Sequence, residues 1–173
     1  MKKNTTPNAS IRGIRNNNPF NIRKGCTWRG ERPNQSDPAF EEFTSMEMGI
    51  RAGLKLIRNH VTGFGGKRKP MNSIAKLIAV WAPPTENNTV EYVRTVSRLS
   101  GIPKTRTIFP DDRRTLLAIA KAMTRVECGV DIPMSYFESA YDLLWITSIE
   151  YAASLVCWSF RLSHTSSFRP SQF

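Results

Sequence analysis

One carboxylate at the end of a helical pattern is well placed for acid–base chemistry. Leu116, Ala120 and Met123 recur at helical spacing, and Glu127 continues their apolar stripe. A glutamate is seldom buried without a function. A carboxyl group held among apolar neighbours has a raised pKa, which a general acid needs near neutral pH. Glu127 is therefore a candidate general acid; the alternative is that it lies in water at the frayed end of its helix.

The segment from Arg12 to Gly30 has the composition of a ligand-binding loop. Three consecutive Asn residues can take left-handed or turn geometry, and Pro19 then fixes the direction of the chain. Amide groups next to aromatic rings suit a sugar, which is polar at its edges and apolar on its faces. The alternative is an Asn-rich turn that enters a β-hairpin. The candidate binding residues of this segment are Asn16, Asn17, Phe20, Asn21 and Trp28.

A second loop, WAPPTENNT, runs from Trp81 to Thr89. It combines an aromatic residue, two prolines, a carboxylate and two Asn residues, which predicts a rigid loop that carries polar side chains. Trp81 and Glu86 are its candidate site residues.

Five amphipathic helices are expected to position these loops. Ser45 is a good N-cap for the first, where Gly49 and Gly53 on adjacent turns would let another segment pack closely. Ser135 and Glu138 would form a capping box for the last. The turn-rich stretch from Gly25 to Phe43 predicts a small β-hairpin or flap, preceded by a short strand through Phe20 and Ile22. The apolar periodicity places the helices at about 46–60, 74–82, 89–100, 112–128 and 135–144.

The net charge of +11 is concentrated in the N-terminal part of the chain. Residues 1–70 contain 14 Lys and Arg against five Asp and Glu. A basic surface attracts polyanions, including nucleic acid, anionic lipid and the acidic cell-wall polymer, and charge alone does not distinguish them. His60 and His164 lie far apart, without acidic or cysteine neighbours at ligand spacing, so we expect no metal and no other cofactor.

The two ends of the chain differ from its centre. The start, MKKNTTPNAS, lacks the apolar core of a secretory signal and is expected to be a flexible lead-in over residues 1–10. Residues 143–160 carry a single charge, Glu150, and are borderline for a membrane span. Placing Glu150 near the centre of a bilayer would cost a few kcal/mol, which favours a buried or partner-facing helix over membrane contact.

The first loop also carries a family resemblance. The run NNNPFNIRKG, followed by Trp28, Gly30 and AFEEFTSMEMGIRAGLKLI, resembles a module of phage and prophage proteins related to the murein hydrolase of enveloped double-stranded-RNA phages. The similarity extends from about residue 12 to about residue 143. It implies a mainly α, lysozyme-like fold of the lytic transglycosylase kind, here over residues 11–142, with residues 143–173 as a hydrophobic helix and polar tail of unknown role.

The resemblance implies a chemistry and roles for individual residues. Glu127 would be the catalytic acid and base. In the resembled families the catalytic Glu precedes the Asn-rich segment, whereas here it follows it, as in a circularly permuted chain. Cys128 stands where the family usually has Ser. Tyr92 would line the glycan groove together with the Asn and Trp residues. A transglycosylase route needs one carboxylate, whereas a hydrolytic variant would need a second, for which Glu86 and Glu42 are available.

We therefore expect a peptidoglycan-degrading enzyme of phage or prophage origin that cleaves the bond between N-acetylmuramic acid (MurNAc) and N-acetylglucosamine (GlcNAc). Its partners would be glycan strands and other virion proteins. It would be found in the virion or in the bacterial cytoplasm, with delivery to the wall by another route. The alternative is a virion structural protein or a basic nucleic-acid-associated protein that keeps the fold without the chemistry.

Overall fold

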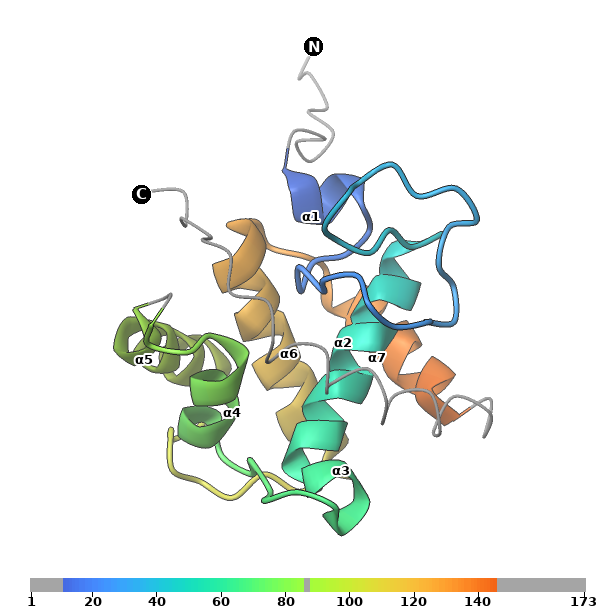
Figure 1. Ribbon diagram of the computed structural model, residues 1–173. Coiled ribbons are helices and arrows are strands. Elements are labelled where there is room, and N and C mark those ends of the chain that lie inside the picture. The colour runs from blue at the N-terminus through green and yellow to red at the C-terminus, as the bar shows by residue number, and fades with distance from the viewer. Residues whose placement is uncertain (1–10, 86–87, 146–173) are drawn as a thin grey trace.

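Helices dominate the computed structural model, which describes residues 11–85 and 88–145. Two helices, α2 and α6, run side by side in opposite directions through the centre, with α4 and α5 on one side and α7 on the other (Figure 1). Within the described ranges, no helix is long and apolar enough to cross a membrane. These residues form α1 (Arg12–Arg15), α2 (Met46–Val61), α3 (Gly63–Gly66), α4 (Ile74–Trp81), α5 (Thr89–Ser100), α6 (Arg113–Cys128), α7 (Met134–Asp142) and the 3-10 turn η1 (Leu143–Trp145).

The predicted amphipathic helices are confirmed, and most begin and end for the expected reasons. Ser45 accepts a hydrogen bond from the Met48 N–H at the start of α2, and Asp112 accepts one from Thr115 at the start of α6. Gly101 and Gly129 take left-handed geometry after α5 and α6, which is a common way to end a helix.

The predicted capping box of α7 is wrong. The helix begins at Met134, with Pro133 at the N-cap position and no side-chain cap hydrogen bond. Ser135 therefore lies inside the first turn, where its hydroxyl cannot accept from the N–H groups that a cap binds.

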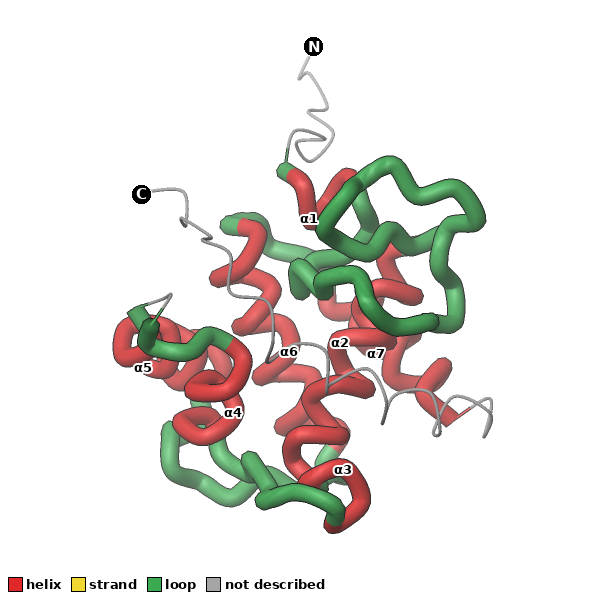
Figure 2. Tube along the Cα trace, in the orientation of Figure 1, coloured by secondary structure: helices red, strands yellow, loops and turns green. Residues whose placement is uncertain are grey.

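Where a small β-hairpin or flap was predicted, the structure has a loop layer, residues 11–44, without the strands of a hairpin. Figure 2 shows this region as loop apart from α1, and the described residues contain no strand, only isolated bridges between Arg23 and Phe40 and between Glu31 and Phe43. Side chains hold the layer together instead. Asn18 accepts from the Ile22 N–H and donates to the carbonyls of Ile22 and Glu41, each at 2.9 Å. The hairpin and the strand through Phe20 and Ile22 are thus corrected, because side-chain amides bind backbone groups that a ladder would pair.

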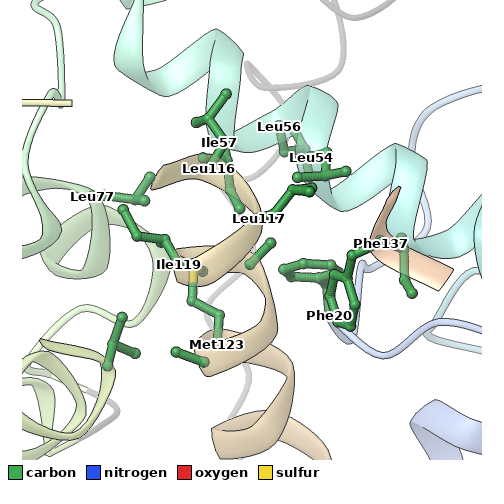
Figure 3. Packing of buried hydrophobic residues seen from close by; sticks show 14 of the residues in the cluster. Phe20, Leu54, Leu56, Ile57, Leu77, Leu116, Leu117, Ile119, Met123 and Phe137 are labelled. Carbon is green, nitrogen blue, oxygen red and sulfur yellow. The ribbon is translucent and has the colours of Figure 1, made fainter. Parts of the chain in front are cut away.

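Apolar side chains from α2, α6 and α7 meet in one core (Figure 3). Leu116, Ala120 and Met123 are fully buried, which confirms the predicted apolar face of α6. Phe20 from the loop layer belongs to the same core, as Figure 3 shows.

The two glycines of α2 allow the loop layer to dock closely. A Cβ atom at Gly49 would lie 1.7 Å from the Asn17 carbonyl oxygen, and one at Gly53 would lie 2.2 Å from the Phe20 ring. Any larger residue at either position would therefore push the loop away. The expected close packing at these glycines is confirmed.

Residues 1–10 and 146–173 lie outside the described residues. The predictions of a flexible lead-in and of a hydrophobic helix through residue 160 fall largely there. The division of the chain into these segments stays a prediction.

Candidate functional site

Three segments that are distant in the sequence meet at Glu127. Glu127 lies half-buried in the last turn of α6. The Asn21 amide, from the loop layer, donates to Oε2 at 3.0 Å, and the Tyr92 hydroxyl, from α5, donates to Oε1 at 2.7 Å. The structure thus brings together Glu127, Asn21 and Tyr92, and it excludes the alternative of a frayed carboxylate in open water.

The last turn of α6 is fixed against the loop layer by Cys128. Its thiol donates to the Pro19 carbonyl at 3.3 Å, and a Cβ atom at Gly13 would lie 2.5 Å from the sulfur. Burial, together with the neighbouring Glu127 carboxylate, raises the pKa of the Cys128 thiol to about 12. The thiol therefore stays protonated as a donor, and α1 rests directly on the end of α6.

Tyr92 is equally constrained on the other side of the carboxylate. It is 9% exposed. Burial raises its pKa well above the usual value of 10, and the charge and hydrogen bond of Glu127 add to the effect. A phenol that keeps its proton is a permanent donor, so Tyr92 holds one carboxylate oxygen in place at any ordinary pH.

The other asparagines stabilise the loop layer itself. Asn16, 2% exposed, donates to the Asp37 carboxylate at 2.9 Å, and Asn17 donates to the Phe43 carbonyl at 3.0 Å. Asn17 and Asn21 have φ angles of 51° and 49°, the left-handed geometry that Asn tolerates well. Substrate binding by Asn16 and Asn17 stays a prediction. In the structure, the side chain of each residue binds another part of the loop layer.

The predicted aromatic residues differ in how much surface they leave for a ligand. Phe20 is 1% exposed and packs edge-on against Trp81, with ring centroids 5.8 Å apart, so it belongs to the core and offers a ligand almost no surface. Trp28 is 6% exposed, and its indole N–H has no hydrogen-bond partner among the described residues. Trp81 is half-buried. Glu86 lies outside the described residues.

Two acidic residues, Glu42 and Asp37, organise the loop layer. Their structural role was not predicted from the sequence. The Glu42 carboxylate accepts from the Ser36 hydroxyl and from the N–H groups of Ser36 and Asp37. Burial would raise its pKa, but these hydrogen bonds and Arg32 hold it below its usual value. Asp37 accepts from the N–H groups of Ala39 and Phe40. The Asp-Pro-Ala-Phe turn carries a recognisable sequence signal for this, whereas nothing in the local pattern marks Glu42.

A cavity lies apart from the site formed by Glu127, Asn21 and Tyr92. A cavity of about 350 Å³ lies against α5 and α6 and is lined by residues such as Leu99, Ala122 and Met134; neither Glu127 nor Asn21 lines it. Over residues 11–85 and 88–145, no group of three or more His, Cys, Asp or Glu side chains is placed to hold a metal ion.

Comparison with known proteins places the chain among phage proteins. No protein-family model matches it. The chain is 37% identical over 145 residues to "Protein P5" of Pseudoalteromonas phage PM2, and the alignment covers 82% of this chain and 85% of that protein. The chain therefore belongs to the family of protein P5 of Pseudoalteromonas phage PM2.

Proposed function

We propose that this phage-related chain is a peptidoglycan-degrading enzyme that cleaves the MurNAc–GlcNAc bond by a transglycosylase route, on a lysozyme-like helical fold. The observation that carries the proposal is the convergence of α6, α5 and the loop layer on the Glu127 carboxylate, through Tyr92 and Asn21. A half-buried carboxylate with both oxygens held by fixed donors is what positioned acid–base chemistry requires.

In the proposed reaction, Glu127 acts first as an acid and then as a base. The protonated carboxyl gives its proton to the glycosidic oxygen as the bond to the muramic anomeric carbon breaks. The resulting carboxylate takes the proton of the muramic C6 hydroxyl, whose oxygen attacks the same carbon and closes an anhydro ring. A carboxylate has about four acceptor sites, so the bonds from Asn21 and Tyr92 leave room for this proton.

The placement of Glu42 removes one of the two candidates for the second carboxylate of a hydrolytic route; the other, Glu86, lies outside the described residues. A hydrolytic mechanism needs a second carboxylate as base or nucleophile. Glu42 is 2% exposed, and three donors of the Ser36–Asp37 turn already bind it. It is thus committed to the loop layer. The relationship to a phage protein also supports a wall-degrading role, because a phage must breach the cell wall of its host.

Replacing Glu127 by Gln tests the proposal. The amide keeps the shape but has no labile proton, so the rate of turbidity loss of purified sacculi should fall about 100- to 10,000-fold. Glu138→Gln, which removes an exposed carboxylate of α7, is the matched control and should retain full activity. Mass spectrometry of the wild-type products should show anhydro-muropeptides, whereas reducing sugars would indicate hydrolysis.

Two results would contradict the proposal. If Glu127→Gln keeps more than about a tenth of the wild-type rate, the general acid lies elsewhere. A wild-type protein that is folded but inactive on sacculi would favour a structural protein of the virion that keeps the fold without the chemistry.

A further inference from the structure

Two arginines of the loop layer are held over one aromatic ring. The guanidinium carbon of Arg12 lies 4.9 Å from the centroid of the Phe40 ring, and that of Arg23 lies 5.1 Å from it. The two cations are therefore no more than about 10 Å apart. Stacking on a ring restricts an arginine side chain and pre-organises its donors. Arg12, Phe40 and Arg23 form what we call the arginine clamp.

The surroundings of the clamp leave positive charge at the surface. Asp37 lies 3.5 Å from the Arg12 Nε atom, but the Arg12 side chain is still 50% exposed. The Asp37 carboxylate also accepts from Asn16 and from two backbone N–H groups. Glu41 and Glu42 are each only 2% exposed. Three of the four carboxylates of the loop layer, Asp37, Glu41 and Glu42, are thus buried, whereas Arg12, Arg15 and Lys24 are exposed, so the outer surface is more basic than the composition alone indicates.

The clamp lies close to Glu127. Arg23 follows Asn21 by two residues, a backbone distance of about 7 Å at most, and the Asn21 side chain contacts the Glu127 carboxylate. Arg12 begins α1, whose Gly13 rests against Cys128 at the end of α6. Both arginines therefore belong to segments that contact the end of α6, where Glu127 lies.

We propose that the arginine clamp binds carboxylates of the stem peptides of the same peptidoglycan strand whose glycan bond lies at Glu127. This proposal rests on the proposed function. A guanidinium group matches a carboxylate with two parallel hydrogen bonds. Asp37 beside Arg12 offsets part of the repulsion between the two guanidinium groups, and a bound anion would offset more of it. The position beside Glu127 favours the acidic wall polymer over nucleic acid as the partner.

Binding without cleavage tests the clamp. The full chain carrying Glu127→Gln is sedimented with purified sacculi at low salt. Adding Arg12→Gln with Arg23→Gln should weaken binding about tenfold. The matched control is Lys67→Gln with Lys69→Gln, an equal loss of charge at exposed positions beyond the far end of α2, which is about 24 Å long. This control should change binding by less than about twofold. Circular dichroism checks that both double variants are folded.

Two further binding experiments identify the chemical group that the clamp binds. Arg12→Lys with Arg23→Lys keeps the charge but loses the planar donor pair, so its binding should fall between those of the parent protein and the Gln variant. On sacculi whose carboxylates have been converted to methylamides, the parent protein and the clamp variant should bind alike. Equal binding by the two Gln double variants, or binding that survives amidation unchanged, would overturn the proposal. So would tighter clamp-dependent binding to duplex DNA than to sacculi.

The result for the clamp is separable from the result for catalysis. If Glu127→Gln abolishes activity but the two double variants bind equally, the clamp fails and the proposed function stands. If Glu127→Gln remains active while the clamp variant loses binding, the catalytic assignment fails and the binding site stands.

Discussion

The loop layer and the helical core of this protein are stabilised by different interactions. In the loop layer, buried Asn, Asp and Glu side chains bind backbone groups directly, as Asn18 and Glu42 do. In the core, helices α2, α6 and α7 bury Leu, Ile and Phe side chains against one another. Glu127 lies where the two regions meet, at the end of a core helix and under an amide of the loop layer. The comparison indicates that the core sets the position of the carboxylate, and that its orientation is fixed from both regions, by Tyr92 of α5 and by Asn21 of the loop layer.

Removing apolar packing should give the largest effect on stability. Leu116→Ala leaves a cavity at a fully buried position between α2 and its neighbours, and we expect the free energy of unfolding to fall by about 2–5 kcal/mol. The loss should be global, because the core supports both regions. Denaturant unfolding monitored by near-ultraviolet circular dichroism measures it. A loss below about 1 kcal/mol would mean that α6 is not central to the core.

Removing the side-chain ties of the loop layer should have a smaller and more local effect. Asn18→Ala deletes three hydrogen bonds and takes the Asn18 partner from the Ile22 N–H and the Glu41 carbonyl, while the Ile22 carbonyl still accepts from the Glu41 N–H; the loss should cost about 2–4 kcal/mol. Limited proteolysis should accelerate within residues 22–43, with little change in α4 and α5. The exposed Asn34→Ala is the control. If cleavage increased equally in all regions, the two regions would not be separable.

The acidity of Glu41 gives a prediction for the loop layer alone. Burial raises the pKa of Glu41 to about 7, and the Glu31 carboxylate adds to the effect. The native state thus binds this proton more tightly than the unfolded state does. The contribution of Glu41 is therefore fully present below pH 4.5 and is lost as the pH rises through about 7.

Glu41→Gln should remove that pH dependence. Relative to wild type, the variant should gain on the order of 2–3 kcal/mol between about pH 4.5 and 8, since it has no carboxylate to ionise in the buried site. Melting temperatures across this range, with Glu138→Gln as a matched change of charge, provide the measurement. Parallel curves for wild type and Glu41→Gln would show that Glu41 ionises without penalty.

The helices could be predicted from sequence and the loop layer could not. Apolar periodicity and the caps Ser45 and Asp112 are local signals, and the structure confirms the helices that they indicated. The packing of the loop layer depends on pairs such as Asn16 with Asp37 and Asn18 with Glu41, more than 20 residues apart. Alternating apolar residues there resembled strands because Phe20 and Ile22 are both buried, but they are buried without a ladder.

The site shows the same division. The apolar stripe, a local property of one helix, made Glu127 a candidate, and the family resemblance gave it the predicted catalytic role. That Asn21, rather than Asn16 or Asn17, contacts it follows from the left-handed turns at Asn17 and Asn21. A run of similar residues gives no signal that distinguishes the one that faces the carboxylate.

The glycines of α2 also have a consequence for cooperativity. Each Gly inside a helix costs about 1 kcal/mol relative to Ala, so the segment around Gly49 and Gly53 is a poor helix on its own. Its missing side chains are replaced by the Asn17 carbonyl and the Phe20 ring. Detaching the loop layer would therefore expose the weakest part of α2 at the same moment. The first turns of α2 and the loop layer should open and close as a single unit, so the Asn21 contact to Glu127 would be gained or lost with that unit, while the Tyr92 contact from α5 would remain.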